Sequence, residues 1–324
     1  MKLPSFIKQK EKIWSQFEQY LGNKTGIDVE VLADLYVEIL EDLSYAKTFY
    51  PKSDIIPYLN NLANRAHRLL YRNRKESSNK IMNFYKRDFP LMFYKYRYYL
   101  LVSFSVFLLF TIIGWYSVYQ DYDFVRAILG DSYVNMTLEN IDKGDPMAVY
   151  KSDAAFNMFL GITLNNIFVA FQAFVYGIIF LIGTIYILMY NGVMLGSFLA
   201  FFDEHNLLWE SFRTIWIHGT IEISVIVVAG AAGLVLGSGL LFPGTYSRLE
   251  SLKRAGKDGV KILISTIPFF IVAGFLEGFV TRHTEMPDFL AIMIILFSLT
   301  LIMFYYVIYP VYLYKNRQNH KINE

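Results

Sequence analysis

Blocks of apolar residues dominate the chain from residue 98 onward, and their lengths predict membrane-spanning helices. Five blocks lie at residues 98–119, 167–190, 214–242, 262–280 and 289–313. Each is close to or above the length of about 20 residues that a helix needs to cross the hydrocarbon core of a bilayer. The mean hydropathy of +0.34 and a charged fraction of only 18% also indicate an integral membrane protein.

A shorter apolar piece at residues 193–202 follows Asn191 and Gly192. Ten helical residues reach only about 15 Å, half the thickness of the hydrocarbon core. Asn191 and Gly192 predict a break between this piece and the span before it. Basic clusters near both ends of the chain predict that both termini lie on the same side of the membrane, which requires an even number of crossings. The five long spans give an odd number, so the short piece has to cross the membrane together with the polar residues that follow it.

Clusters of Lys and Arg near the span ends predict the orientation. Such clusters occupy residues 65–97, 245–261 and 315–317, and cytoplasmic segments are the ones enriched in these residues. Both termini are therefore expected in the cytoplasm. Residues 120–164 are rich in Asp and Glu, and we expect them outside as a loop with little core of its own. The predicted fold is an all-α polytopic membrane bundle of about six crossings, one of them short and broken.

The N-terminal residues predict a soluble helical domain. Apolar positions recur at helical spacing in residues 6–20, 29–49 and 55–71. Basic and aromatic residues then alternate up to residue 97, directly before the first span, which favours an interfacial helix on an anionic leaflet over a nucleic-acid surface. We therefore expect a cytoplasmic helical domain at 1–97, a transmembrane bundle at 98–313 and a cytoplasmic tail at 314–324.

Three ionisable residues fall inside the predicted spans. His218 and Glu222 are four residues apart and share one helix face, and Glu277 lies in the next span. A Glu at membrane depth costs roughly 2–3 kcal/mol even on lenient scales, so it normally faces protein or water. Asn191 and Asn166 mark predicted span ends, where interrupted helices of transporters hold their substrates. These five residues form the predicted intramembrane polar site.

Three interpretations of His218, Glu222 and Glu277 remain open: an internal polar network that fixes helix register, a proton, ion or solute site of a permease, and an intramembrane hydrolase or metal site. A water-filled cavity that reaches His218 and Glu222 would favour transport, whereas a dry and fully paired cluster would favour packing. The chain has no Cys, which excludes thiolate catalysis and Cys-ligated metals. No HExxH, GxSxG, Walker or dinucleotide-binding motif occurs, so we predict no catalytic, cofactor-binding or metal-ligating residues.

Glycines recur at the four-residue spacing that lets membrane helices approach closely. The predicted packing positions are Gly192, Gly196, Gly230, Gly233, Gly237, Gly274 and Gly278. Small residues at this spacing allow two helix backbones to gain dispersion contacts. They indicate a compact bundle or a homodimer.

Several of these motifs occur together in a known family. Asn191-Gly-Val-Met-Leu-Gly196, His218-Gly-Thr-Ile-Glu222 and Gly274-Phe-Leu-Glu-Gly-Phe-Val-Thr281 follow one another between about residues 160 and 282. In this region the chain resembles the stage II sporulation protein M family of bacterial and archaeal membrane proteins. Residues 34–43, 58–68 and 87–90 are similar to longer members, which carry a cytoplasmic helical domain.

The resemblance implies a helper role. The sporulation member works with peptidoglycan-degrading partners as a scaffold, and longer members are often encoded near a MoxR-type AAA+ ATPase. We therefore expect a non-enzymatic, multi-pass protein of the bacterial inner membrane that acts as a scaffold or docking component in a cell-envelope process. The alternative is a proton- or ion-coupled permease with a buried His/Glu site. Expected partners are an anionic inner leaflet and membrane or cytoplasmic proteins, an AAA+ ATPase system among them, with no nucleic acid and no cofactor.

Overall fold

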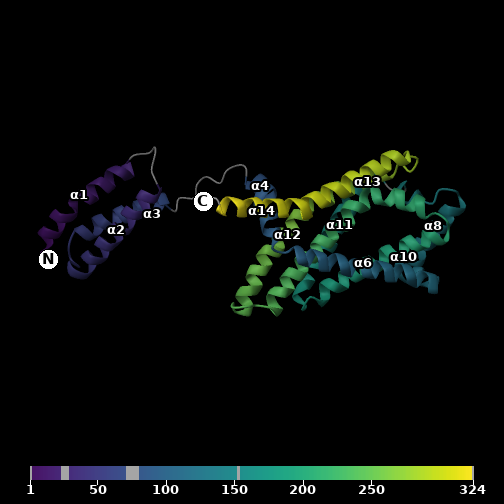
Figure 1. Cartoon of the computed structure of the whole chain (residues 1–324), viewed down its shortest axis with the longest axis horizontal. Helices are drawn as coiled ribbons and strands as arrows, with labels where there is room; N and C mark the ends of the chain where they lie inside the picture. The colour runs from purple at the N-terminus through teal and green to yellow at the C-terminus, as the bar shows by residue number, and fades with distance from the viewer. Residues whose placement is uncertain (1, 23–28, 71–79, 152–153, 323–324) are drawn as a thin grey trace. The chain divides into compact units, whose positions relative to one another are not determined.

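A computed structural model describes the chain except for residues 1, 23–28, 71–79, 152–153 and 323–324. Every regular element among the described residues is a helix (Figure 1). The chain divides into two compact units, Met1–Lys80 and Ile81–Glu324. Arg72, Arg74 and Lys75, which belong to the predicted basic stretch, lie outside the described residues.

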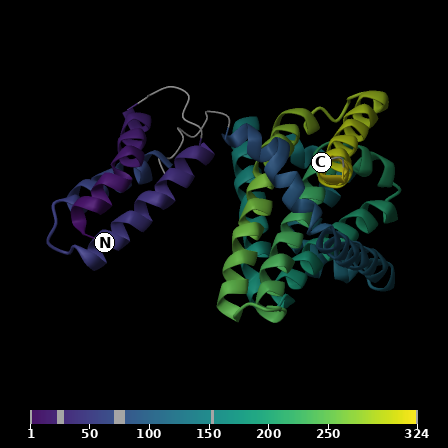
Figure 2. The same ribbon diagram turned by 60° about the vertical axis from the view of Figure 1, so that its left-hand side comes forward.

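The first unit is a bundle of three helices (Figure 2). These are α1 (Leu3–Gly22), α2 (Val29–Phe49) and α3 (Ile55–Leu70). In α3, the buried apolar residues recur at positions 59, 62, 63 and 66, which places them on one face of the helix. They meet buried side chains of the other two helices, so this unit has a hydrophobic core of its own.

A polar contact joins α1 to α2 inside this unit. The indole Nε1 of Trp14 donates a hydrogen bond of 2.8 Å to Asp42. Lys10 Nζ lies 3.3 Å from the same carboxylate and 3.0 Å from Glu38. Because Asp42 is almost completely buried, both partners are needed to offset the loss of its hydration.

The second unit is built from membrane-spanning helices. Within the part of the chain that the structure describes, six segments are long and apolar enough to cross a bilayer, and the chain is a multi-pass membrane protein. The segments are α6 (Arg97–Gln120), α9 (Ala155–Val175) with η3 (Tyr176–Ile178), α10 (Ile182–Glu204), α11 (Leu208–Leu241), α12 (Arg248–Phe275) with η4 (Leu276–Thr281), and α13 (Asp288–Met303) with η5 (Phe304–Ile308) and α14 (Tyr309–Ile322). The predicted all-α bundle of about six crossings is confirmed.

Helix α11 is the centre of this unit. It contacts α6, α9, α10, α12 and α13. In its most apolar part, 78% of the residues are buried in protein, a larger share than in any other spanning segment described. The Ala-Gly run at residues 229–233 is fully buried and gives the neighbouring helices room to approach. Polar residues on α11 therefore face protein rather than lipid.

The predicted break at Asn191 and Gly192 is wrong. Both residues lie inside α10, which is continuous, and Asn191 Nδ2 donates a 2.8 Å hydrogen bond to the carbonyl of Ile187 one turn earlier. The chain turns instead at Phe180 and Leu181, which have φ values of 47° and 69°. The preceding span begins at residue 155 rather than at 167, so none of the six crossings found in the described residues is short.

The expected loop at 120–164 is also wrong, because much of this segment is helical and packed. It contains α7 (Asp123–Leu129), α8 (Asp131–Asp142) and η2 (Ala148–Lys151). Their buried side chains share a hydrophobic cluster with the ends of α6 and α10: Val118, Val125, Val134, Met147, Ala200, Phe201 and Phe202. We call residues 121–151 the capping segment, since it covers one end of these two spanning helices.

The described part of the basic stretch packs on the membrane unit through its aromatic residues. It comprises α4 (Lys80–Asn83), η1 (Phe84–Asp88) and α5 (Phe89–Tyr94). Phe89 and Phe93 are completely buried, and both rings contact Tyr306. Lys86 and Arg87 are exposed. The predicted binding of the basic stretch to an anionic leaflet stays a prediction.

Candidate functional site

The three ionisable residues of the spanning helices lie together. His218 and Glu222 come from α11 and Glu277 from η4, and one potential ligand atom from each lies within 4.8 Å of the other two. His218 Nε2 is 3.6 Å from Glu277 Oε2. Only 5% of the His218 side chain and 14% of the Glu277 side chain is exposed. These groups therefore face protein, as expected from the cost of placing them against acyl chains.

A π-helical turn shapes one wall of the cluster. After α12 ends at Phe275, the backbone continues as the π-helix Leu276–Thr281. Such turns are rare and often mark functional sites. Glu277 and Thr281 both come from this turn, and both contact the same imidazole: Thr281 Oγ1 lies 3.0 Å from His218 Nδ1. The two contacts hold the His218 ring in one orientation.

Helix α9 supplies a further polar group. Asn166 is buried and its side chain hydrogen-bonds Glu222. The neighbouring Asn165 is exposed, so only one residue of this pair belongs to the cluster. We call Asn166, His218, Glu222, Glu277 and Thr281 the polar cluster. It is assembled from three spanning segments that are far apart in the sequence.

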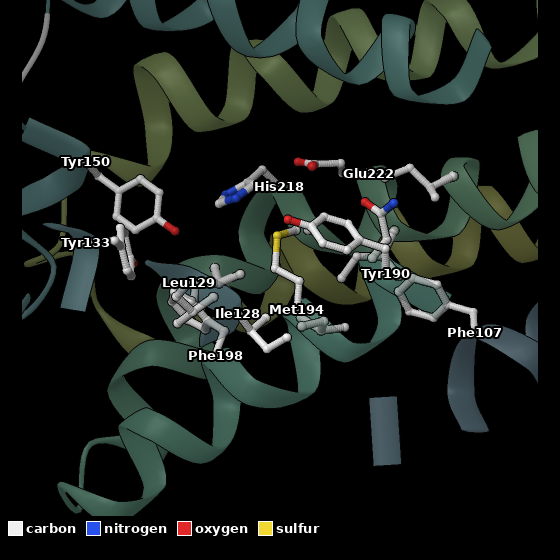
Figure 3. A pocket seen from close by; sticks show the side chains of 16 residues that line it. Phe107, Ile128, Leu129, Tyr133, Tyr150, Tyr190, Met194, Phe198, His218 and Glu222 are labelled. Atoms are coloured by element: carbon white, nitrogen blue, oxygen red, sulfur yellow. The ribbon is translucent and has the colours of Figure 1, made fainter. Parts of the chain in front are cut away.

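A cavity of about 400 Å³ adjoins the polar cluster. Figure 3 shows the His218 imidazole between the Tyr150 ring and the Glu222 carboxylate, at the wall of this cavity. The Tyr150 and His218 ring centroids are 5.7 Å apart. Asn191 also lines the cavity. Tyr133, Tyr190 and Met194 also line the cavity, and most of its other walls are apolar.

The capping segment closes one side of the cavity with two tyrosines. Tyr133 comes from α8 and Tyr150 from η2. Burial raises the pKa of Tyr133 to about 12 and raises the pKa of Tyr150 well above its ordinary value of 10. Both hydroxyls are therefore neutral near pH 7 and can donate hydrogen bonds into the cavity.

Sequence reasoning did not identify these tyrosines or Thr281. Tyr133 and Tyr150 lie in a region that was expected to be a loop, and nothing in their spacing connects them to α11. In the sequence, Thr281 stands only at the end of a motif. Its role depends on the π-helical turn, which apolar periodicity does not reveal.

The predicted packing glycines face other helices of the same chain. A Cβ on Gly192 would lie 2.7 Å from the Phe107 carbonyl oxygen of α6, and a Cβ on Gly278 would lie 2.8 Å from the Ala155 carbonyl oxygen of α9. Similar overlaps with neighbouring segments would arise at Gly196, Gly230, Gly233, Gly237 and Gly274. These close approaches are intramolecular, so a homodimer draws no support from them and stays a prediction.

Comparison with known families covers both units. Residues 4–72 match the family described as "Domain of unknown function (DUF8413)". Neither a curated protein nor a solved structure matches the chain. Residues 103–282 match the family described as "Stage II sporulation protein M", over more than half of the chain and across the whole polar cluster. The chain therefore belongs to the stage II sporulation protein M family.

Proposed function

We propose that this protein is a permease that moves protons or a small cation through the membrane by way of the cavity beside His218 and Glu222. One observation carries the proposal: a cavity of about 400 Å³ reaches two ionisable side chains of a spanning helix. Ionisable residues inside a membrane protein typically mark ion and proton pathways. A dry and fully paired cluster would have favoured packing alone.

The lining of the cavity fits a small polar solute. Asn191, Tyr133 and Tyr150 add polar groups around His218 and Glu222, while the other walls are mainly apolar. A site of this size holds several water molecules, and the polar side chains give them hydrogen-bond partners. A small cation can therefore keep part of its hydration shell there.

One edge of the cavity lies at the outer face of α10. Tyr190 and Met194 line it from α10, and their exposed fractions are 48% and 39%. The opposite side is covered by the capping segment. Movement of the capping tyrosines would open that side of the cavity.

Flux through purified protein tests this proposal. We expect proteoliposomes loaded with a pH-sensitive dye, or with a Zn²⁺-sensitive dye in a parallel arm, to show faster proton or Zn²⁺ entry than protein-free vesicles under an imposed gradient. Glu222→Gln should slow that entry at least about tenfold, the scale expected for losing a positioned proton-transfer group. Glu285→Gln is the control, because Glu285 is exposed on the turn after η4. No flux in either arm, or equal flux with Glu222→Gln, contradicts a permease.

A second function has separate support. The unit at residues 1–80 has its own hydrophobic core, which suits it to docking a protein partner in a non-enzymatic scaffold. The test is co-purification of a MoxR-type AAA+ ATPase from the same cell with the full chain and with a variant lacking residues 1–80. Retention by the full chain alone supports docking. Equal retention, or none, contradicts it.

The localisation that we propose is the bacterial inner membrane with both termini in the cytoplasm. Six crossings place the start of α6, the turn between α11 and α12 and the end of α14 on one side. The first turns of α12 carry exposed Lys253 and Arg254, in agreement with a cytoplasmic side. Since the chain has no Cys, single-cysteine variants report topology directly. Asn140→Cys in the capping segment should react with an impermeant maleimide outside intact cells, and Lys257→Cys should not.

A further inference from the structure

We propose that His218, Glu222 and Glu277 bind a first-row divalent metal ion, with Zn²⁺ as the reference ion. Their potential ligand atoms lie within 4.8 Å of one another, and the His218–Glu277 pair is at 3.6 Å. Four ligands with bonds of about 2.0–2.2 Å around Zn²⁺ are separated by about 3.4 Å in a tetrahedron. Side-chain rotations that bring these atoms about 1 Å closer together would complete the site.

Charge favours an ion at this place. Glu222 and Glu277 each bring a carboxylate oxygen within 4.8 Å of a ring nitrogen of His218, inside the membrane unit. Like charges at this separation disfavour simultaneous ionisation, and burial strengthens their repulsion. A divalent cation between them replaces repulsion with attraction and substitutes for the water that both groups have lost.

The surrounding residues orient the ligands as in known metal sites. When Nδ1–H of His218 donates to Thr281 Oγ1 at 3.0 Å, Nε2 presents its lone pair toward Glu277. Metal-bound histidines generally donate their second ring N–H in this way. Asn166 holds Glu222 by a side-chain hydrogen bond. His218 and Glu222 therefore each have an outer hydrogen-bond partner.

The site has three protein ligands and an open side. His218 and Glu222 also line the cavity of about 400 Å³, so water or a solute can occupy the fourth position. One imidazole and two carboxylates suit Mn²⁺, Fe²⁺, Co²⁺ and Zn²⁺ better than Cu⁺, which prefers sulfur, or Ca²⁺, which prefers oxygen alone. The inference rests on the cavity of the proposed permease and names the class of its cation, but binding is measurable without flux.

Equilibrium binding to the purified full-length protein tests the site. The protein, free of any histidine tag and stripped with a chelator, is titrated with Zn²⁺ in competition with a fluorescent Zn²⁺ chelator. We expect one ion per chain, and Glu277→Gln and His218→Asn should each weaken binding by more than about 100-fold. Glu285→Gln and His283→Asn are the matched controls, because both side chains are exposed on the turn after η4, and they should bind as the wild type does.

Two milder variants keep the test decisive if the ligand variants fail to fold. Thr281→Val removes only the outer hydrogen bond and should weaken Zn²⁺ binding about 10–100-fold. Glu277→Asp keeps the charge but withdraws it by one methylene, and it should alter the visible absorption of bound Co²⁺. The proposal is overturned if the wild type binds no Zn²⁺, or if both folded variants bind as the wild type does. Proton flux without metal binding contradicts the metal site but not the permease. Metal binding without flux contradicts the permease but not the metal site.

Discussion

Replacing Gly192 with alanine tests how α6 and α10 are held together. Gly192 is buried on α10, and a Cβ there would lie 2.7 Å from the Phe107 carbonyl oxygen and 3.2 Å from the Thr111 nitrogen. Ordinary van der Waals contact begins at 3.4 Å, so the two backbones must separate by 3.4 − 2.7 = 0.7 Å. The obstructing atoms belong to the backbone of a spanning helix, which cannot rotate out of the way as a side chain can.

The expected cost follows from two opposing effects. Overpacking of a close contact costs about 1–3 kcal/mol. Alanine is favoured over glycine inside a helix by about 1 kcal/mol. The net loss for Gly192→Ala is therefore about 0–2 kcal/mol. Gly161→Ala is the matched control, since Gly161 is exposed on α9 with no atom within 4 Å of its Cβ position. It should gain about 1 kcal/mol from helix propensity alone, so the difference between the two variants isolates the overpacking.

Equilibrium unfolding by SDS in mixed micelles, followed by far-UV circular dichroism, gives both free energies of unfolding. We expect Gly192→Ala to be less stable than Gly161→Ala by about 1–3 kcal/mol. Gly196→Ala should behave like Gly192→Ala, because its Cβ would overlap the Thr111 carbonyl oxygen of the same helix α6. The double variant should cost less than the sum, since one displacement of α6 relieves both overlaps. Equal stability of Gly192→Ala and Gly161→Ala would refute close backbone packing at this crossing.

Three further predictions concern contacts away from the cavity. Asp42→Ala should lower the free energy of unfolding of the N-terminal unit by about 1–3 kcal/mol, because the buried Trp14 indole N–H loses its 2.8 Å acceptor. Hydrogen exchange of the α2 amides measures this loss. The hydrogen bond to Glu38 raises the pKa of Lys10 above 10.5, so its stabilising effect is complete below about pH 10.5 and is lost as pH rises through the folded-state pKa. The melting temperature, followed by circular dichroism, should therefore decrease as the pH rises above about 10.5. Lys10→Met should make this decrease smaller. Arg213→Lys should speed hydrogen exchange in residues 282–288, because the guanidinium joins the Thr284 carbonyl and Asp288, both at 2.7 Å, and an ammonium cannot hold both in the same way.

The sequence was most informative where physical cost left few options. An imidazole and carboxylates inside apolar spans had to meet protein or water, and the structure places His218, Glu222 and Glu277 together. The i, i+4 spacing of the first two already placed them on one helix face. The third could be expected nearby only from its cost in lipid, since no spacing rule relates α11 to η4.

The sequence was misleading where a polar residue lies inside a helix and where apolar residues form a turn. Asn191 looks like a helix end, but its amide bonds a carbonyl of its own helix and the helix continues. Phe180 and Leu181 form the actual turn in a left-handed conformation that costs such residues roughly 1–2 kcal/mol each. Apolar side chains at that position gave no turn signal. Gly177, one turn earlier, packs directly on the backbone of α11 at Gly233.

This relocated turn is what completes the polar cluster. If the span had begun at residue 167, Asn166 would have stood at its end, near the polar boundary of the membrane. With the helix beginning at Ala155 and turning at residues 179–181, Asn166 lies in the middle of α9 and reaches Glu222 across the interface with α11. Its amide can be buried there because Glu222 accepts its hydrogen bond, and the Glu222 carboxylate is oriented because the amide is fixed. The bounds of α9 thus place Asn166 among the polar groups inside the bundle.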